Sequence, residues 1–553
     1  MSVDTINEPP RLPGEFLVPS TMERAGVIEV RLGPSAPVPR VQLDGFAWPS
    51  CRITALEYDS RQVKKGALYF ALPGLHVDGH DYIPDAVNRG ALAVVHQKEL
   101  AAYSEGILYI RVKDSRFAMS PIADAFHDFP SRRMGIIGVT GTEGKSTTVS
   151  LIYQLLKLLG KKAGFISTVQ HGDGITEHWN SEHQTTPEAV AIHRMLARMR
   201  ENGVEFVVLE SSSHGLSKRT NRLGDVRFDV GVMTNVTHDH LEFHGTWEQY
   251  RSDKAELFRS LDSPAPPRHT KQVASMELPL PSFGVVNADD PSADYFAAAT
   301  MHKTYRFSVK GASADLSLRL VESGPDGNWY EAFAASTGAM LTLRDQLPGA
   351  FNVGNVLAAI LVVSSLLSVE AETLAQFVPY LKPVRGRMTT IHRGQPFEAL
   401  VDYAHTPSSF EAVLNPLRER LNVSGGRLIC LFGSPGERDT QKRFLQGEVA
   451  ARYSDTVILT DEDPRGEEPM AILEEIAKGC QTSQRMIRDE TLFLIPGRPQ
   501  AIRKAFSLAA AGDIVILLGK GHENSIIYAD KTIDYDEIKE AETALEEAGY
   551  RLA

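Results

Sequence analysis

Short apolar runs alternate with amphipathic stretches through most of the chain. Residues 204–210 and 228–234 are apolar runs of the length of buried parallel strands, and residues 146–159 and 247–261 have the pattern of helices that cover a sheet. Strand and helix patterns that alternate in this way predict parallel sheets with helices on both faces. The expected fold class is therefore α/β.

Shifts in this pattern divide the chain into three domains and an extension. Residues 1–45 are rich in Pro and Gly and show no clear period, so we expect an irregular N-terminal extension. Residues 46–132 predict a small N-terminal α/β domain, and residues 133–384 predict a central domain with a doubly wound sheet. Residues 385–553 carry a second βαβ series and predict a C-terminal Rossmann-like domain.

Composition and charge exclude several classes of protein. The 553 residues carry a net charge of −12, which argues against a general binder of nucleic acid or of anionic membranes. The three cysteines, Cys51, Cys430 and Cys480, form no CxxC pair, which excludes a zinc ribbon and a disulfide scaffold. The longest apolar runs are too short to span a membrane, and residues 1–5 show no signal-peptide pattern. We expect a cytoplasmic monomer that acts on small molecules.

The clearest chemical motif is a glycine-rich turn between a strand and a helix. Residues 138–146 read Gly-Val-Thr-Gly-Thr-Glu-Gly-Lys-Ser, so three glycines at three-residue intervals can aim backbone N–H groups at phosphate oxygens. Val139 stands where the common Walker A pattern has its first glycine, so this is a variant phosphate loop. A glycine-rich turn with an incidental Lys-Ser is the alternative. The residues expected to bind ATP here are Gly138, Thr140, Gly141, Thr142, Gly144, Lys145, Ser146 and Thr147.

Polar residues follow the two apolar runs of the central domain. Glu210 ends one run, and three histidines and two acids, among them His240, follow the other. Open α/β sheets place ligands at the carboxyl ends of their strands, and Mg·ATP requires oxygen-rich ligands. A helix cap or ordinary loop polarity would explain either segment alone.

Motifs in a fixed order resemble those of the ATP-dependent Mur ligases from about residue 59 to the C-terminus. Besides the phosphate loop they are Glu210-x-Ser-Ser-His, Thr234-Asn-x-x-x-Asp-His240, His244-Gly-Thr-x-Glu-x-Tyr-x-x-x-Lys254, Gly349-x-x-Asn352-x-x-Asn355, Gly386-Arg387, Asp402-Tyr-Ala-His-Thr-Pro407, Phe432-Gly-x-x-Gly-Glu-Arg-Asp439, Asp463-Pro-Arg465 and Gly519-Lys-Gly-His-Glu523. The last three motifs, together with Asp59-Ser-Arg61, resemble the MurE type in particular, which adds the third residue of the peptidoglycan stem peptide.

The resemblance implies a reaction and a set of metal ligands. ATP would phosphorylate the D-Glu γ-carboxylate of UDP-N-acetylmuramoyl-L-Ala-D-Glu, and the amine of a diamino acid would then displace phosphate. Lys145, Glu210, His240 and Lys254 are the implied catalytic residues. Mg²⁺ would be held by Ser146, Glu210, His240 and Lys254, the last as a carbamate formed with CO₂. Without the motif, Lys254 would be read as a surface lysine of an amphipathic helix.

The resemblance also implies substrate contacts. Asn352, Arg387 and Asp402 would contact ATP, whereas Asn355 and His405 have equally plausible structural roles. The expected contacts of the UDP-muramoyl peptide are Ser60, Thr185, Thr186, Ser212 and Arg222, with Arg219 as the alternative to Arg222.

The incoming amino acid would be bound by Arg438, Asp463, Arg465, Gly519 and Glu523. Enzymes that take meso-diaminopimelate carry Asn where this chain has Asp463. The additional negative charge favours L-lysine or L-ornithine, while Arg465 and Glu523 favour diaminopimelate, so the sequence leaves the acceptor open. A second departure is Glu143, where the family commonly has Asn.

Two other functions are compatible with parts of the pattern. One is a different Mur ligase or a folylpolyglutamate-type ligase, which the Asp-Pro-Arg and Gly-Lys-Gly-His-Glu motifs disfavour. The other is a non-catalytic ATP-binding partner protein, which the intact Lys145, Glu210, His240 and Lys254 disfavour.

Overall fold

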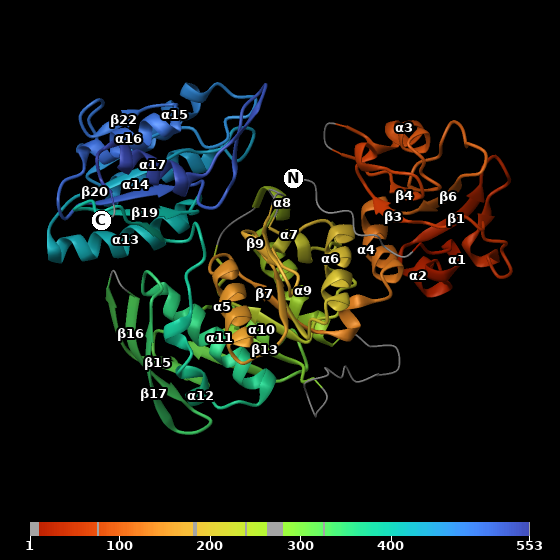
Figure 1. Ribbon diagram of the computed structural model, residues 1–553, viewed down its shortest axis with the longest axis horizontal. Helices are drawn as coiled ribbons and strands as arrows, with labels where there is room; N and C mark the ends of the chain where they lie inside the picture. Colours follow the sequence, from red (N-terminus) through yellow and green to blue (C-terminus); the bar gives the residue numbers. More distant parts are fainter. Residues whose placement is uncertain are drawn as a thin grey trace.

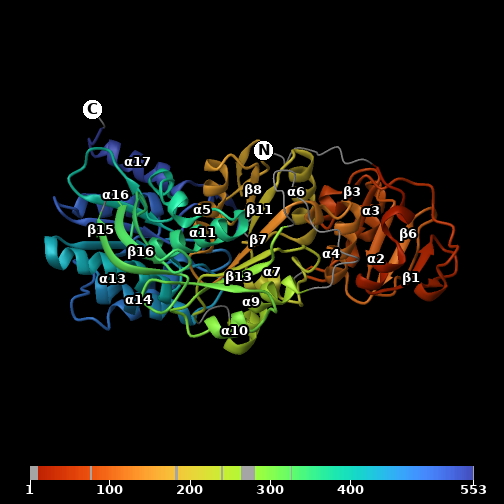
Figure 2. The ribbon, with the colours of Figure 1, turned by 90° about the horizontal axis from the view of Figure 1, so that it is seen from below.

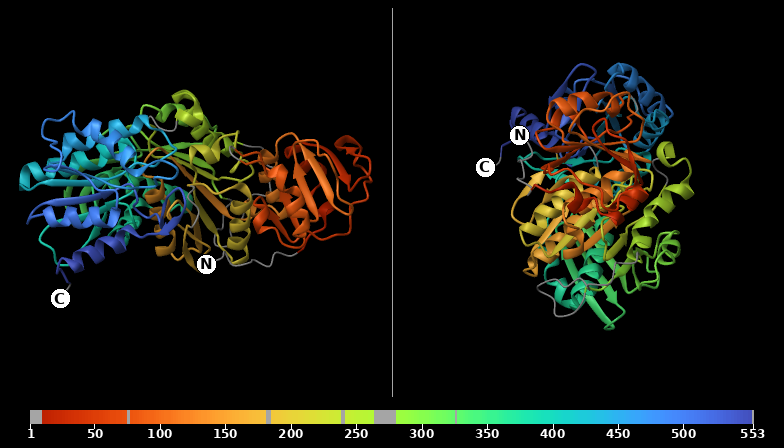
Figure 3. Two further views of the ribbon diagram at one scale, coloured as in Figure 1. Left: turned by 90° about the horizontal axis from the view of Figure 1, so that it is seen from above. Right: turned by 90° about the vertical axis from the view of Figure 1, so that its right-hand side faces the viewer.

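A computed structural model describes residues 10–74, 77–180, 185–237, 241–262, 280–324 and 327–551. Three bodies built on separate sheets succeed one another along the chain, and the central one lies between the other two (Figures 1 and 2). Figure 3 shows the same elongated arrangement from above in its left view, and its right view has the N-terminal domain turned towards the viewer. The α/β class and the three-domain architecture predicted from the sequence are confirmed.

The N-terminal sheet has the strand order β2-β1-β6-β5-β4-β3, in which β3 to β6 are parallel. Its elements are α1 (Pro13–Phe16), α2 (Pro19–Arg24), β1 (Val27–Leu32), β2 (Val38–Pro39), η1 (Arg40–Gln42), β3 (Ala55–Glu57), η2 (Ser60–Gln62), β4 (Ala67–Phe70), η3 (Gly79–Tyr82), α3 (Ile83–Asn88), β5 (Ala93–His96), β6 (Leu108–Val112), α4 (Ser115–Phe126) and η4 (Pro130–Arg133).

The prediction of an irregular extension over residues 1–45 is wrong for the part that is described. Strand β1 pairs antiparallel with β6, and Val27 and Val30 are buried in the core of this domain. The strand escapes pattern analysis because its buried positions are three residues apart, and the pairing with β6 shifts register between Val27 and Glu29. These residues are therefore part of the N-terminal domain.

The central sheet has eleven strands in the order β10-β9-β8-β11-β7-β12-β13-β14-β15-β16-β17. The strands β8, β11, β7, β12, β13 and β14 run parallel, whereas the two ends of the sheet are antiparallel. Because the strand order reverses around β7, the end of β7 is a topological switch point, where open α/β sheets bind their ligands. The phosphate loop begins at that point.

The central elements continue the numbering along the chain. They are β7 (Gly135–Thr140), α5 (Lys145–Leu158), β8 (Ala163–Ile166), β9 (Gln170–Gly172), β10 (Glu177–Trp179), α6 (Ala189–Glu201), β11 (Phe206–Glu210), α7 (Ser213–Leu216), β12 (Val230–Met233), α8 (Leu241–His244), α9 (Trp247–Leu261), β13 (Phe283–Asn287), α10 (Ala293–Ala297), β14 (Thr304–Ser308), β15 (Leu316–Gly324), β16 (Gly327–Ala334), β17 (Ala339–Asp345), α11 (Phe351–Leu367), α12 (Ala371–Ala375) and η5 (Val378–Tyr380).

Helices cover both faces of the central sheet, as the doubly wound pattern predicts. Helices α5 and α11 pack on one face, and α6, α9 and α10 pack on the other. Strands β15 to β17 extend the sheet beyond the doubly wound part and lie below the C-terminal domain in Figure 1.

The C-terminal sheet has the order β18-β19-β23-β20-β21-β22, in which all strands except β18 are parallel. Helices α13 to α15 pack on one face and α16 and α17 on the other, as a Rossmann-like domain requires. The elements are β18 (Thr389–Ile391), β19 (Glu398–Asp402), α13 (Pro407–Ser424), β20 (Leu428–Phe432), α14 (Gln441–Tyr453), β21 (Thr456–Leu459), α15 (Pro469–Cys480), β22 (Leu492–Leu494), α16 (Arg498–Leu508), β23 (Ile514–Leu518), β24 (Ser525–Ile527), β25 (Thr532–Asp534) and α17 (Glu537–Glu547).

Candidate functional site

The phosphate loop connects β7 to α5 and uses glycine where no other residue fits. Gly141 and Gly144 have positive φ angles of 152° and 81°. A Cβ atom on Gly144 would lie 2.6 Å from Asn355 Oδ1, so both the backbone angle and the neighbouring side chain require glycine. The N-terminus of α5 is thereby left open to an anion.

Contacts with the segment after β12 hold the loop in shape. The Thr142 amide donates to the Asn235 carbonyl (2.8 Å), and the Glu143 amide donates to Asn235 Oδ1 (2.9 Å). The Glu143 carbonyl accepts a hydrogen bond from Thr234 Oγ1 (2.6 Å). Because these contacts use the backbone of Glu143, the replacement of Asn by Glu at this position leaves them in place.

Ser146 and Glu210 form the polar centre of the loop region. Ser146 Oγ lies 3.0 and 2.9 Å from the two carboxylate oxygens of Glu210, and both side chains are buried. The Thr168 amide donates to Glu210 Oε2 (2.7 Å), which fixes the carboxylate further. A hydroxyl and a carboxylate are the donors that Mg²⁺ prefers, so this pair suits one magnesium ion. Lys145 lies over the loop and donates to the Thr142 carbonyl (2.7 Å).

Lys254 lies beside the phosphate loop, although helix α9 is amphipathic. Its side chain is buried, and Nζ donates to the Gly141 carbonyl (2.7 Å) and lies 4.5 Å from the centre of the Tyr250 ring. The surface-lysine alternative is therefore wrong. In the described part of the chain no three His, Cys, Asp or Glu side chains converge as a metal cluster. His240 lies outside the described residues.

Thr186, Ser212 and Arg222 lie together, next to Glu210. Thr186 Oγ1 contacts Ser212 Oγ (2.8 Å) and donates to the backbone carbonyl of Glu210 (3.1 Å). Arg222 donates to the Thr186 carbonyl (2.9 Å), whereas Arg219 donates to the Phe243 carbonyl. Thr185 precedes this cluster in the chain. Glu210 thus contacts both groups of residues. Its side chain meets the phosphate loop, and its backbone carbonyl meets the expected muramoyl-peptide residues.

Two residues that the sequence analysis did not select join this cluster. Glu188 Oε1 accepts hydrogen bonds from Arg222 (3.0 Å) and from Arg116 (2.7 Å), which belongs to helix α4 of the N-terminal domain. Glu188 follows the Thr185-Thr186-Pro pattern directly, but no sequence signal indicates its partner 72 residues earlier.

The C-terminal domain reaches the phosphate loop through Arg387. Its guanidinium lies 3.3 Å from Ser146 Oγ and 4.7 Å from the centre of the Tyr403 ring. Asp402 accepts hydrogen bonds from the amides of Met388 and Ala404 (both 2.7 Å) and so braces the segment that carries Arg387. Burial raises the pKa of Asp402, and the charge of Arg387 opposes this shift.

Asn352 is engaged within the protein at both ends of its amide. It donates to the Pro348 carbonyl (2.7 Å) and accepts from Asn355 Nδ2 (2.9 Å), and Asn355 in turn accepts from Thr148 Oγ1 of α5 (3.1 Å). The Asn352–Asn355 pair therefore connects helix α11 to the helix that follows the phosphate loop. His405 contacts the carbonyl of Tyr403 through Nδ1 (2.9 Å).

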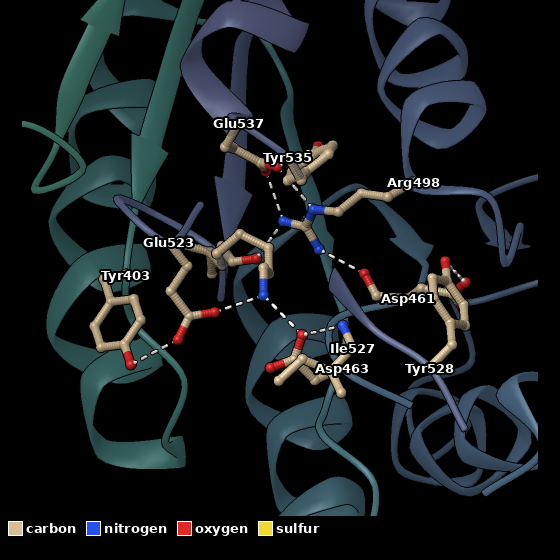
Figure 4. A network of polar contacts seen from close by, with 11 residues as sticks. Tyr403, Asp461, Asp463, Arg498, Glu523, Ile527, Tyr528, Tyr535 and Glu537 are labelled. Carbon is tan, nitrogen blue, oxygen red and sulfur yellow. Dashed lines mark hydrogen bonds and ion pairs between the residues drawn. The ribbon is translucent and has the colours of Figure 1, made fainter. Parts of the chain in front are cut away.

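The expected amino-acid ligands gather where β19, β21 and β23 end. Asp463 Oδ1 accepts from Lys520 Nζ (2.9 Å) and from the Ile527 amide (3.0 Å), and Glu523 accepts from Lys520 (2.5 Å) and Tyr403 (3.1 Å), as Figure 4 shows. Gly519 has a φ of 99° and faces Glu462.

Asp463 is paired with Lys520, which also pairs with Glu523, and the argument from sequence did not include this shared cation. Lys520 lies within a motif that the sequence analysis recognised, yet the spacing gives no sign that its side chain is buried.

Arg465, Arg438 and Ser60 complete the candidate residues. Arg465 has a positive φ of 54°, and its amide donates to the Ile527 carbonyl (2.9 Å). Arg438 is exposed on the loop before α14. Ser60 begins η2 in the N-terminal domain and is buried, so it belongs to a different body from Thr186.

His522 connects this region to the central domain. Its ring contacts the Tyr403 ring in a tilted arrangement, with 4.6 Å between the ring centres. Burial lowers the pKa of His522 well below its ordinary value, Arg387 lowers it further, and a hydrogen bond to the Thr168 backbone opposes the shift. The sequence motif contains His522, but only the fold reveals that it meets the segment that binds Glu210.

Comparison with known proteins agrees with this geometry. Residues 52–127 match the description "Mur ligase family, catalytic domain", residues 139–363 "Mur ligase middle domain", and residues 386–521 "Mur ligase, glutamate ligase domain". The chain is 48% identical to a UDP-N-acetylmuramyl-tripeptide synthetase of Treponema pallidum (strain Nichols), with 90% of this chain and 94% of the relative covered.

Two further relatives extend the comparison. A UDP-N-acetylmuramoyl-L-alanyl-D-glutamate–2,6-diaminopimelate ligase of Geobacillus thermodenitrificans (strain NG80-2) is 38% identical, with 90% of this chain and 95% of the relative covered. A solved structure of a UDP-N-acetylmuramoyl-L-alanyl-D-glutamate–2,6-diaminopimelate ligase is 27% identical with a TM-score of 0.57, and covers 91% of this chain and 97% of that chain.

The fold, the phosphate loop and these matches define an ATP-dependent ligase. The chain belongs to the Mur ligase family, so the resemblance drawn from its motifs is confirmed. Within the described residues, no helix is long and apolar enough to cross a membrane.

Proposed function

We propose that this protein joins a diamino acid to the D-Glu γ-carboxylate of UDP-N-acetylmuramoyl-L-Ala-D-Glu at the expense of ATP, in the synthesis of peptidoglycan precursors. The observation that carries the proposal is the double role of Glu210, whose side chain contacts Ser146 of the phosphate loop and whose carbonyl contacts Thr186. A carboxylate bound at Thr186 and Ser212 would then lie near the γ-phosphate. The N-terminal domain, which is 46–132 together with the described residues before it, would bind UDP. The domains 133–384 and 385–553 would bind ATP and the amino acid, in a cytoplasmic monomer.

The first step brings an anionic carboxylate to an anionic triphosphate, so the site must supply positive charge. The loop amides, the N-terminus of α5 and Lys145 would bind the phosphates, and Arg387 would reach them from the C-terminal domain. Mg²⁺ held by Ser146 and Glu210 would neutralise charge between the two anions when bound. Gly138, Thr140, Thr142 and Thr147 would complete the phosphate site, with Asn352 and Asp402 on the nucleoside side.

Lys254 would serve as a carbamate rather than as an ammonium. A free ammonium beside the loop would repel a second magnesium ion, whereas a carbamate formed with CO₂ offers it two oxygens. The support for this role is the position of Nζ beside the phosphate loop, where a carbamate would be near a metal ion bound with the phosphates. His240 would complete the second metal site.

In the second step the amine attacks the carbonyl carbon of the acyl phosphate. The new C–N bond forms, the amine loses a proton, and the carbon–oxygen bond to phosphate breaks, which releases inorganic phosphate. Arg222 would orient the peptide, Ser60 the uridine end, and Arg438, Asp463, Arg465, Gly519 and Glu523 the incoming amino acid. The acceptor is a diamino acid, either meso-diaminopimelate or a basic one such as L-lysine or L-ornithine.

The proposal is tested by phosphate release from ATP and Mg²⁺ with UDP-N-acetylmuramoyl-L-Ala-D-Glu and each of the three acceptors. We expect release only when the muramoyl peptide and a suitable acceptor are both present. Release without the muramoyl peptide, or none with any acceptor, would overturn the proposal and favour the non-catalytic or another ligase function.

A further inference from the structure

A buried serine, histidine and aspartate form a chain of hydrogen bonds in the central domain, beside the residues proposed to bind the muramoyl peptide. His244 Nδ1 lies 2.7 Å from Asp253 Oδ2, and His244 Nε2 lies 3.1 Å from Ser213 Oγ. The second carboxylate oxygen of Asp253 accepts from Gln249 Nε2 (2.9 Å). Ser213, His244 and Asp253 are all buried, so a group that lost its partner would be costly, and the network favours a single arrangement.

The order of these groups is that of a serine nucleophile with its base, but the geometry indicates another role. A nucleophilic serine must present its hydroxyl to a substrate. Here the Ser213 hydroxyl contacts the His244 ring, and both residues are buried. The group therefore connects elements of the fold and does not act on a ligand directly.

His244 connects two helices that adjoin the proposed site. Ser213 begins α7 and follows Ser212, one of the proposed muramoyl-peptide residues. Asp253 belongs to α9 and precedes Lys254. Helices α7 and α9 lie side by side (Figures 1 and 2). The contacts of His244 thus join the muramoyl-peptide side of the site to the helix that carries Lys254.

A further contact of His244 leads to Lys254 through an aromatic ring. The ring centres of His244 and Tyr250 are 5.2 Å apart, and Lys254 Nζ lies 4.5 Å from the centre of the Tyr250 ring. Tyr250 Oη lies 3.1 Å from Thr142 Oγ1 of the phosphate loop. Tyr250 therefore contacts the imidazole, the lysine and the loop at once, and a change at position 244 alters the surroundings of all three.

We propose that His244 is a positioning residue for phosphate transfer, which holds α9 against α7 through Asp253 and Ser213 and so fixes the separation between Lys254 and a carboxylate bound at Ser212. The inference rests on the proposed function and deepens it. Transfer of phosphate requires the reacting atoms to be aligned, and a misplacement of about 1 Å can cost about 10²-fold in rate. The loss of His244 should therefore lower kcat and leave substrate affinity nearly unchanged.

A histidine that only stabilised the fold would have the same contacts, so the test is a double-variant cycle in the full-length protein. His244→Asn removes the imidazole, and the shorter side chain cannot reach both Ser213 and Asp253. Lys254→Ala and the variant with both substitutions complete the cycle. Phosphate release with UDP-N-acetylmuramoyl-L-Ala-D-Glu, ATP, Mg²⁺ and a productive acceptor gives kcat and each KM, with high enzyme concentrations for the slow variants. Thermal unfolding gives the melting temperature of every variant.

We expect His244→Asn to lower kcat by about tenfold or more, with each KM within about threefold of the wild type. In the Lys254→Ala background the same substitution should lower kcat by less than about threefold, because residues that act through one another are not additive. The separation that His244 fixes no longer matters once the Lys254 side chain is absent.

The matched control is His80→Asn in the N-terminal domain. His80 is also buried, its Nδ1 lies 2.6 Å from Asp78 Oδ1, and its Nε2 accepts from the Gln97 amide (3.1 Å). This substitution should lower the melting temperature, because it also breaks a buried pair, and should leave kcat within about twofold of the wild type.

An unchanged kcat in His244→Asn, or a loss of equal size with and without Lys254, would overturn the inference while leaving the ligase function intact. If His244→Asn does not fold, Ser213→Ala removes only one hydroxyl of the network, and its effect on kcat with and without Lys254→Ala decides the matter in the same way. A wild-type protein inactive with all three acceptors would overturn the proposed function instead.

Discussion

At the scale of single residues, the site depends on side chains that serve two partners at once. Glu210 contacts Ser146 of the phosphate loop with its carboxylate, and it contacts Thr186, one of the proposed muramoyl-peptide residues, with its carbonyl. Lys254 and Gly141 form a similar junction, because a side chain of helix α9 contacts the backbone of the loop directly. We therefore expect a substitution of Glu210 to affect both the proposed phosphate site and the proposed muramoyl-peptide site.

Lys254→Ala should reduce kcat at least ~10²-fold. The variant would lack the proposed carbamate, which would hold the metal ion that neutralises the charge of the triphosphate and the substrate carboxylate. Short carboxylic acids should restore part of the activity by supplying the missing carboxylate, and phosphate release measures both effects. Lys218→Ala is the matched control, since Lys218 is exposed and pairs with Glu256 of α9, the helix that carries Lys254. A fully active Lys254→Ala would contradict the role proposed for Lys254.

The residue scale also shows what spacing can and cannot predict. The phosphate loop, Glu210 and the pair Thr186–Ser212 follow from strand ends and motifs, since those positions are fixed by the sheet. Arg116 and Lys520 do not follow, because a guanidinium from another domain and a buried lysine are brought in by tertiary packing alone. The pairing of Asp463 with Lys520 does not follow for the same reason, because its partner is 57 residues away.

At the scale of elements, the proposed phosphate site lies at the start of helix α5, and a glycine stands next to each end of this helix. Gly144 precedes the helix and Gly160 follows it, and both have positive φ angles. A Cβ on Gly144 would collide with Asn355, whereas nothing lies within 4 Å of one on Gly160. Alanine at either position incurs the free-energy cost of a positive φ angle, but only alanine at position 144 also collides with a neighbouring side chain. A comparison of the two variants therefore separates the two effects.

Gly144→Ala should weaken ATP binding at least tenfold, because it displaces Asn355 and the start of α5. Gly160→Ala carries only the backbone cost, about 1 kcal/mol of stability, and should leave ATP affinity unchanged. Calorimetric titration with ATP and Mg²⁺ measures the affinity, and thermal unfolding measures the stability. Equal ATP affinity in the two variants would be evidence against the collision.

Helix α4 carries a buried carboxyl group, that of Asp124, whose titration should make the stability of the protein depend on pH. Asp124 is inaccessible, and neither of its oxygens has a hydrogen-bond partner in the described part of the chain. Arg24, Arg132 and His193 lie 3.5 to 3.7 Å away. Burial and the nearby Asp225 raise the pKa of Asp124 to about 7, although the two arginines oppose the shift. Burial lowers the pKa of His193 to about 3, so it stays neutral above that pH.

The folded state thus holds a proton on Asp124 that the unfolded state loses near pH 4. The wild type should lose stability, relative to Asp124→Asn, as the pH rises from about 4 to about 7, by up to about 4 kcal/mol, with no further change above pH 7. Denaturant unfolding across this range measures the difference. Asp128→Asn is the control, because Asp128 is exposed, and its difference from the wild type should not follow this curve. A pH-independent difference for Asp124→Asn would contradict the prediction.

The order of elements was largely predictable from the sequence, whereas the edges of the sheets were not. Helix α9 and strands β11, β12, β20 and β23 follow from apolar runs and amphipathic period. Strand β1 was missed because its register is irregular, and β15 to β17 because an antiparallel extension has no signal that assigns it to a particular sheet.

At the scale of the whole molecule, the proposed function requires contact between the central and C-terminal domains. Arg387 reaches Ser146 across this junction, and Gln154 of α5 exchanges hydrogen bonds with the backbone of Lys382. Gly386 packs so closely on His522 that a Cβ atom would lie 2.4 Å from its amide nitrogen. The segment 382–387, which joins the two domains, is therefore packed against the loop that carries Lys520 and Glu523.

Arg387→Lys should lower kcat at least tenfold with little change in the KM for the muramoyl peptide, because a lysine cannot reproduce the planar contact over Tyr403 and the reach to Ser146. Steady-state phosphate release measures both constants. Arg393→Lys, whose partners Glu542 and Glu546 lie within the C-terminal domain, should retain full activity. A kcat unchanged in Arg387→Lys would show that this contact does not contribute to catalysis.

The central claim is that the phosphate loop transfers phosphate to a carboxylate held beside Glu210. The most direct test uses UDP-N-acetylmuramoyl-L-Ala-D-Glu with both γ-carboxylate oxygens labelled with ¹⁸O, together with ATP, Mg²⁺ and a productive diamino acid. The account predicts one ¹⁸O in each inorganic phosphate and one in the new amide carbonyl, because the carbon–oxygen bond of an acyl phosphate is broken. Amide product formed together with unlabelled phosphate would contradict it.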